Sequence, residues 1–263
     1  MPPLKSTTRR LLELALWLLF VLPAAGAILL SLSLLLYMYW PHDFGEINFD
    51  AFTPTQSNVM VLAHGLRDTP ASWIDPLLLA LRDEHYDGQL MPVDWSRYAR
   101  SEVRCAIDGR RIGERIGDQI ASSEMVKSVH LVGHSCGAFV IYGACQAIKA
   151  VNPHILVQTT YLDPVSIYGP LPHYGVGRFG DCADYSDAYI DTQDDVIGSN
   201  QLLPHTHTYD VTAVRNRVHS TIPPHVWPTE YYRRLVEQGR MPELRLDPAL
   251  ATRKPEGVLE VVD

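Results

Sequence analysis

A short segment around Ser135 holds residue types at a spacing that suits nucleophilic chemistry. The run Gly133–Gly137, Gly-His-Ser-Cys-Gly, stands between an apolar segment and a segment of small and apolar residues. Glycines beside a serine let a strand turn sharply into a helix, so that the hydroxyl projects above the sheet and the helix N-terminus lies beneath it. Such a serine becomes a nucleophile when a neighbouring base takes its proton. The pattern therefore predicts Ser135 as the nucleophile of an acyl-transfer reaction.

Attack by a serine creates a negatively charged oxygen, which needs preorganised N–H donors. We expect one donor to be the backbone N–H of Cys136, directly after the nucleophile. The second is expected from Leu66, because it follows the first apolar run of the folded part. His64 and His134 flank this site but precede the nucleophile in the chain, so we expect them to pack against the site rather than serve as its base.

The residues around these positions alternate between strand and helix patterns. Short apolar or β-branched runs predict strands at 59–63, 89–93, 128–132 and 155–162, and more weakly at 188–190 and 208–211. Apolar residues at helical spacing predict helices at 73–81, 107–120, 138–150 and 227–238. Strands that alternate with helices imply an α/β domain with a mostly parallel sheet and helices on both faces.

The N-terminal part differs from the rest, because residues 15–41 contain no Asp, Glu, Lys or Arg. A run of roughly 20 apolar residues is enough to span the hydrocarbon core of a bilayer as a helix. The competing interpretation is a cleaved signal peptide, but its apolar region is typically about 7–15 residues long. No small-x-small cleavage site follows Trp40. We therefore expect an uncleaved transmembrane anchor.

The apolar run and the strand and helix patterns divide the chain into five expected parts. They are a cytoplasmic N-terminus at 1–10, a transmembrane anchor at 11–40, a linker at 41–57, an α/β domain at 58–240 and a C-terminal tail at 241–263. Lys5, Arg9 and Arg10 precede the apolar run, whereas Asp43 and Glu46 follow it. Since basic residues favour the cytoplasmic side, the folded domain is expected outside the cytoplasm, in the periplasm if the source is bacterial.

The net charge and the residue pattern argue against nucleic acid, metal and cofactor as partners. The formal net charge is −8, and no Lys/Arg cluster with interleaved aromatic residues occurs, so nucleic acid is not an expected partner. His205 and His207 alternate as on one strand face, but no further ligand set accompanies them, and we expect neither a metal nor a cofactor. Cys136 and Cys145 are expected to be buried thiols, and Cys105 and Cys182 could form a disulfide outside the cytoplasm.

Four segments together resemble the pancreatic-type lipase and phospholipase family of α/β-hydrolases. The segments are 58–66, 92–98, 129–138 and 161–164, in the order and approximate spacing of that family. The combination of Val-Asp-Trp, Gly-His-Ser-x-Gly-Ala and Leu-Asp-Pro is far more specific than any one of them. The resemblance covers roughly residues 58–235. It implies an α/β-hydrolase fold and a serine ester hydrolase whose triad runs Ser, Asp, His along the chain.

The resemblance also implies the acid and the base of the triad. In such lipases the acid is the aspartate of the Leu-Asp-Pro segment, which corresponds to Asp163. Asp191 stays an alternative, because many other α/β-hydrolases place their acid one strand later. The base corresponds to His225, which stands just before a helix with a tyrosine pair, as in the family. His219 stays an alternative base that lacks this frame.

The expected function is that of a membrane-anchored carboxylester hydrolase, lipase-like or esterase-like, which acts on an ester or lipid substrate through an acyl-enzyme. The stretch between Asp163 and His225 is shorter than in the large lipases, and the tail is too small for their lipid-binding β-sandwich. Residues 167–174 could form a wall of the acyl pocket. The same triad serves amidases and thioesterases, and a catalytically silent partner-binding protein of this fold is the alternative from another class.

Overall fold

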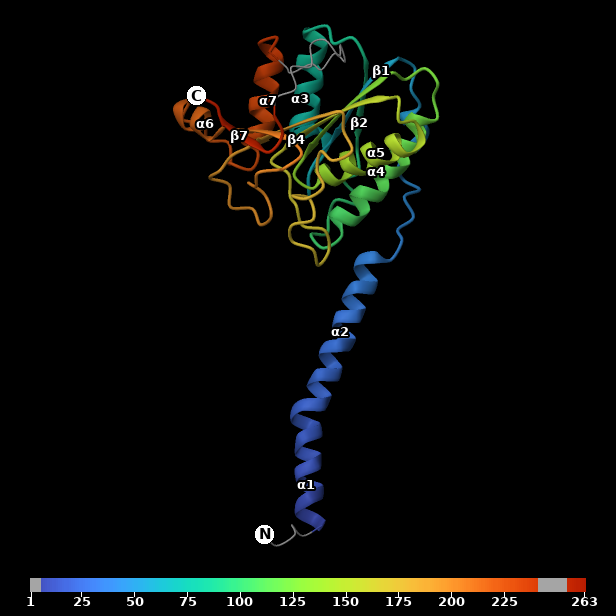
Figure 1. Ribbon diagram of the computed structural model, residues 1–263, viewed down its shortest axis with the longest axis vertical. Helices are drawn as coiled ribbons and strands as arrows, with labels where there is room; N and C mark the ends of the chain where they lie inside the picture. Colours follow the sequence, from blue (N-terminus) through green and yellow to red (C-terminus); the bar gives the residue numbers. More distant parts are fainter. Residues whose placement is uncertain (1–5, 241–254) are drawn as a thin grey trace. The chain divides into compact units, whose positions relative to one another are not determined.

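Within the residues that the structure describes, one parallel sheet of seven strands positions the residues singled out by the sequence (Figure 1). Its order is β2-β1-β3-β4-β5-β6-β7, and every neighbouring pair is parallel. The strands are β1 Asn58–Ala63, β2 Gln89–Val93, β3 Ser128–His134, β4 Leu156–Leu162, β5 Tyr185–Ile190, β6 His207–Asp210 and β7 Val258–Val261. The computed structural model describes residues 6–240 and 255–263.

Helices cover both faces of the sheet, as the sequence predicts (Figure 1). Helices α4 (Cys105–Ala121) and α5 (Gly137–Val151) lie on one face, where their buried side chains join one apolar core. Helices α3 (Pro70–Asp83) and α7 (Trp227–Glu237) lie on the other face and join a second core. The short helix α6 (Thr212–Arg217) follows β6. The expected α/β architecture is therefore confirmed.

The central strands are buried on both faces, which explains why their sequences are apolar without strict alternation. In β3, Val129 and Leu131 contribute to the core beside α4 and α5, whereas Val132 contributes to the core beside α3 and α7. The carboxyl ends of parallel strands all lie at one edge of the sheet. Loops that follow β1, β3, β4 and β5 therefore gather at that edge and can bring distant residues together.

The chain divides into two compact units between His42 and Asp43. In the first, α1 (Ser6–Leu16), a π-helical segment at Trp17–Val21 and α2 (Leu22–Tyr39) follow one another. The change of hydrogen-bond pattern comes directly before Pro23, which has no N–H to donate. Residues Thr8–Tyr39 make a helix of 32 residues, which contains an 18-residue stretch with a mean hydropathy of 2.4. It is long and apolar enough to cross a membrane.

Both segments that flank the expected domain contribute to the folded unit. Phe44 and Phe52 of the expected linker are buried in the core beside α4 and α5, and Phe49–Phe52 forms a 3-10 turn. The expected loose tail supplies β7, the edge strand that pairs with β6. Residues 241–254 lie outside the described residues. A four-residue strand in a proline-rich tail gives too short a pattern to predict from sequence.

Disulfides join Cys105 to Cys136 and Cys145 to Cys182. The expected Cys105–Cys182 pair is therefore wrong, and Cys136 and Cys145 are not free thiols. The packing of α4 against α5 decides the pairing, because it brings the start of one helix beside the residue that precedes the other. Spacing along the sequence carries no information about that packing.

Removal of the Cys145–Cys182 disulfide by the double substitution C145A/C182A is expected to lower the free energy of unfolding by about 2–4 kcal/mol, because the bond restricts a long loop of the unfolded chain. Urea unfolding of the detergent-solubilised protein measures the difference. A thiol titration of the unreduced, denatured protein is the control, and it should find no free thiol. Four reactive thiols would contradict both disulfides.

Candidate active site

Ser135 stands at the turn between β3 and α5, at the carboxyl edge of the sheet. Its φ is +54°, a left-handed backbone conformation that is uncommon for a residue with a side chain. Its N–H donates to the carbonyl of Leu162 at the end of β4 (3.0 Å). This is the sharp strand-to-helix turn that the sequence predicts, and it directs the hydroxyl away from the sheet.

Two glycines allow other chain segments to approach this turn. A Cβ on Gly137 would lie 2.3 Å from the carbonyl oxygen of Ala63, so α5 can begin beside the end of β1 only because Gly137 has no side chain. A Cβ on Gly65 would lie 2.8 Å from the Cβ of Ser135. The loop after β1 is therefore in contact with the serine.

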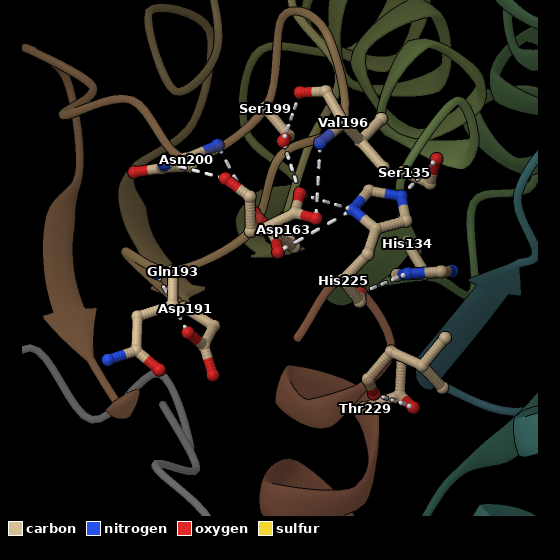
Figure 2. A network of polar contacts seen from close by, with 12 residues as sticks. His134, Ser135, Asp163, Asp191, Gln193, Val196, Ser199, Asn200, His225 and Thr229 are labelled. Carbon is tan, nitrogen blue, oxygen red and sulfur yellow. Dashed lines mark hydrogen bonds and ion pairs between the residues drawn. The ribbon is translucent and has the colours of Figure 1, made fainter. Parts of the chain in front are cut away.

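His225, two residues before α7, contacts the serine hydroxyl (Figure 2). Its Nε2 lies 2.9 Å from Oγ of Ser135, although the two residues are 90 positions apart in the sequence. This is the distance of a hydrogen bond through which a proton can pass. The structure thus brings together the two residues that the sequence proposes as nucleophile and base.

His134 holds the backbone of His225 in place. Its Nε2 lies 2.9 Å from the carbonyl oxygen of His225, and the two ring centroids are 4.9 Å apart. Burial, together with the nearby charge of His225, lowers the pKa of His134 to about 4. The ring is therefore neutral near pH 7, and Nε2–H donates to the carbonyl. His134 positions His225, which agrees with the packing role expected for it.

Two carboxylates face the other side of the His225 ring. Oδ2 of Asp194 lies 2.9 Å from Nδ1, and Oδ2 of Asp163 lies 3.5 Å from the same atom. Asp163 directly follows β4, and Asp194 lies in the loop after β5. Asp163 is the acid that the family resemblance implies. Asp194 was not among the residues expected from the sequence, because loops after strands contain many aspartates and only tertiary packing shows which one reaches the histidine.

Charge and burial shift the pKa values of Asp163, Asp194 and His225 in different ways. Burial raises the pKa of Asp163 to about 7, although His225 and the N–H of Asn200 oppose the shift. Burial would also raise the pKa of Asp194, but hydrogen bonds from His225 and Ser199 outweigh it and hold the pKa below its usual value. Burial would lower the pKa of His225, but the two carboxylates outweigh it and raise that pKa to about 9.

Asp191 and His219 are the alternative acid and base that the sequence left open. Asp191 is buried and accepts hydrogen bonds from Arg215 and Thr212, so its charge is balanced by an arginine rather than by His225. His219 lies just after α6, with a left-handed φ of +49°. The hydroxyl of Ser135 is bonded to His225 instead.

The expected oxyanion donors are both beside the serine. Cys136 precedes the first residue of α5, where the N–H groups of a helix have no partner within the helix. Leu66 follows Gly65, whose backbone contacts Ser135. Within residues 6–240 and 255–263, no backbone carbonyl outside the regular helices and strands accepts the N–H of Leu66 or Cys136. Both donors are thus available to a reacting oxygen.

Trp95 of the Val-Asp-Trp segment fixes the loop that carries Leu66. Its backbone N–H lies 3.3 Å from Nε2 of His64, and its indole N–H donates to the His64 carbonyl at 2.9 Å. The two rings also stack, with centroids 5.7 Å apart. Burial lowers the pKa of His64, so the ring can accept the backbone N–H. His64 therefore packs and positions, as expected.

Asp163, Asp194 and His225 could also hold a cation, since one ligand atom from each lies within 4.8 Å of the others. A cation on Nδ1 of His225 would leave the ring hydrogen on Nε2, and the ring could not then accept the proton of Ser135. Metal binding and base catalysis therefore exclude each other here.

His207, the other histidine considered as a metal ligand, lies elsewhere. It is bonded to Glu260 (2.8 Å) and to the Pro255 carbonyl (3.1 Å), and it connects β6 to the chain around β7.

A model of the alpha/beta hydrolase family matches residues 60–259. This match is to the broad family and does not single out the pancreatic-type lipases. A comparison with curated protein sequences finds no match.

Several solved structures are similar. A candidate hydrolase of the alpha/beta superfamily from Xanthomonas campestris pv. campestris is 15% identical, with a TM-score of 0.46, over 68% of this chain and 96% of that one. An extracellular alpha/beta-hydrolase from a Paenibacillus species is 20% identical, with a TM-score of 0.30, over 41% of each chain. A lipase-esterase related protein from Clostridium acetobutylicum is 10% identical, with a TM-score of 0.36, over 54% of this chain and 77% of that one. Likenesses at this level carry no argument about function.

The pKa of His225 predicts an alkaline activity profile for hydrolysis through Ser135. Only the neutral imidazole accepts a proton, so kcat/KM should rise about tenfold per pH unit below the pKa of His225 and level off above about 9. Initial rates with a p-nitrophenyl ester over a range of pH measure the profile. The rate of Ser135→Ala at each pH gives the background. A plateau that begins at about pH 6.5, the pKa of an unperturbed histidine, would contradict the raised pKa.

The contact between Gly65 and Ser135 predicts a second loss of activity. A methyl group at Gly65 would push the loop or the serine, so Gly65→Ala should lower kcat on the order of 100-fold. Gly177→Ala is the matched control, because a Cβ there meets nothing within 4 Å. Steady-state kinetics compare the kcat of Gly65→Ala with that of Gly177→Ala. Equal activity in the two would show that the loop contact is unimportant.

Proposed function

The chain belongs to the alpha/beta hydrolase family, and on this basis we propose that it is a membrane-anchored serine hydrolase that cleaves acyl esters. The observation that carries the proposal is the 2.9 Å contact between Oγ of Ser135 and Nε2 of His225, with carboxylates on the opposite side of the imidazole. A serine, a base and an acid in this order are the parts that acyl transfer through a covalent intermediate requires.

The proposed reaction has two halves. His225 takes the proton of Ser135 as Oγ attacks the acyl carbon, and the N–H groups of Leu66 and Cys136 stabilise the oxyanion. His225 then gives the proton to the leaving alcohol, which leaves an acyl group on Ser135. Water then gives a proton to His225 and attacks this ester, the bond between the acyl carbon and Oγ breaks, and His225 returns the proton to Oγ as the acid is released. Asp163, the acid implied by the family resemblance, stands with Asp194 at Nδ1 and stabilises the imidazolium.

An acyl ester, either a lipid or a smaller carboxylester, is the proposed substrate class. The Val-Asp-Trp, Gly-His-Ser-x-Gly-Ala and Leu-Asp-Pro segments resemble those of lipases, and this resemblance supports an ester over an amide. The expected acyl-pocket wall is aromatic: Tyr168 stacks on Tyr174 at 4.7 Å and lies 5.6 Å from Phe139 of α5. An apolar wall of this kind suits an acyl chain.

We propose that the N-terminal helix anchors the enzyme, with the N-terminus in the cytoplasm and the catalytic domain outside. The helix Thr8–Tyr39 has the length and hydropathy of a membrane span. The two disulfides support the proposed orientation, because such bonds persist in oxidising compartments and are rare in the cytosol.

Ser135→Ala tests the proposed chemistry. The variant should keep the fold and lose turnover of p-nitrophenyl esters, since no other group forms the acyl-enzyme. A fluorophosphonate probe should label the wild-type protein at Ser135 and leave the variant unlabelled. Matched esters, thioesters and amides of one acid then define the bond that is cleaved. Undiminished ester hydrolysis by the purified variant would refute the assignment.

A further inference from the structure

One imidazole N–H faces two carboxylates, and it can make a strong hydrogen bond to only one of them. When Nε2 of His225 accepts the proton of Ser135, Nδ1 carries a single hydrogen. Oδ2 of Asp194 lies 2.9 Å from Nδ1, within the normal range for N–H···O, whereas Oδ2 of Asp163 lies at 3.5 Å, outside it. The two aspartates are therefore not equivalent.

Asp194 is surrounded by donors that suit a charged carboxylate. Its Oδ1 accepts the backbone N–H of Val196 at 3.2 Å, and its Oδ2 accepts the hydroxyl of Ser199 as well as Nδ1–H of His225. Hydrogen bonds of this kind stabilise the ionised form and fix the direction of both oxygens. Asp194 is thus held as an anion that points at the histidine.

Asp163 has a different setting. Its side chain is fully buried, and Oδ1 accepts only the N–H of Asn200, at 3.2 Å. Among the residues that the structure describes, Oδ2 has no hydrogen-bond partner. The side chain of Asn200 in turn donates to the carbonyl oxygens of Asp194 (3.0 Å) and Thr192 (3.3 Å). Asp163 therefore holds, through Asn200, the loop from which Asp194 extends.

We propose that the two aspartates divide the support of His225: Asp194 is the carboxylate that orients the imidazole, and Asp163 is a brace for the loop that carries Asp194. The inference rests on the proposed serine chemistry. The proton of Ser135 moves to Nε2, while Nδ1 keeps its hydrogen and shares it with Asp194. Both aspartates are positioning residues, because they act on the reaction through His225.

The isosteric variants Asp194→Asn and Asp163→Asn separate these roles. In Asp194→Asn, the amide oxygen is needed by the N–H of Val196, so the amide nitrogen faces Nδ1. Two N–H groups cannot point at each other, so the imidazole takes the tautomer with hydrogen on Nε2 and cannot accept the serine proton. We expect kcat to fall by about a thousandfold or more, with KM nearly unchanged.

Asp163→Asn keeps an oxygen for the N–H of Asn200 and leaves the bond between His225 and Asp194 in place. Its plateau kcat should stay within about tenfold of the wild type, since the correct tautomer is preserved. The loss of a negative neighbour lowers the pKa of His225, so the acid limb of kcat/KM should move to lower pH. A residue with a purely structural role would not move this limb.

The kinetics of the two variants decide the proposal. It is overturned if Asp163→Asn shows the larger loss, if both variants lose kcat equally, or if neither loses it. Thermal unfolding checks that each variant is folded. Should Asp194→Asn not fold, Ser199→Ala removes one donor from Asp194, and it should lower the plateau kcat more than Asp163→Asn does. An active Ser135→Ala would refute the serine chemistry itself, whereas an inactive one with a mild Asp194→Asn refutes only the division of roles.

Discussion

Ser135 adopts a left-handed backbone conformation, and the rest of the site depends on the contacts that hold it there. For a residue with a side chain this conformation costs about 1–3 kcal/mol, which the surrounding structure must supply. The N–H of Ser135 is bound by the carbonyl of Leu162, and its own carbonyl accepts the N–H groups of Ala138 and Val165. The serine is thus held by α5 and by both residues that flank the Asp163–Pro164 pair. A change in the end of β4 would therefore move Ser135 and Asp163 together.

His225 is positioned from both sides by groups of different charge. The neutral ring of His134 donates to its backbone carbonyl, and two aspartates face its Nδ1. Burial and the nearby charge of His225 give His134 a low pKa, whereas the carboxylates outweigh burial and give His225 a high one. Two adjacent imidazoles thus have opposite protonation near neutral pH. This difference keeps His134 a structural donor and supports the proposed role of His225 as the group that exchanges protons with Ser135.

The fold could be predicted from the sequence because its signals are local. Buried parallel strands are short apolar runs, and the turn at Ser135 needs glycines at fixed offsets, so the sheet and Ser135 followed from the pattern alone. The role of Asp194, the pairing of the cysteines and the strand β7 could not be predicted from the sequence, because each depends on how separate segments pack. Asp191 and Asp194 follow the same strand and are equally plausible in sequence. The direction of the folded loop places Asp191 against Arg215 and Asp194 against His225.

The disulfide Cys105–Cys136 connects the site to the compartment proposed for the domain. Cys136 supplies a proposed oxyanion donor through its backbone, while its side chain is bonded to the first residue of α4. The helices α4 and α5 pack on the same face of the sheet, so the bond ties the start of one to the turn that begins the other. In a reducing compartment this tie would be lost, and the donor would be held by the backbone of Gly137 and Ser135 alone. The extracytoplasmic location proposed for the domain would therefore supply the oxidising condition that preserves this tie at the proposed oxyanion donor.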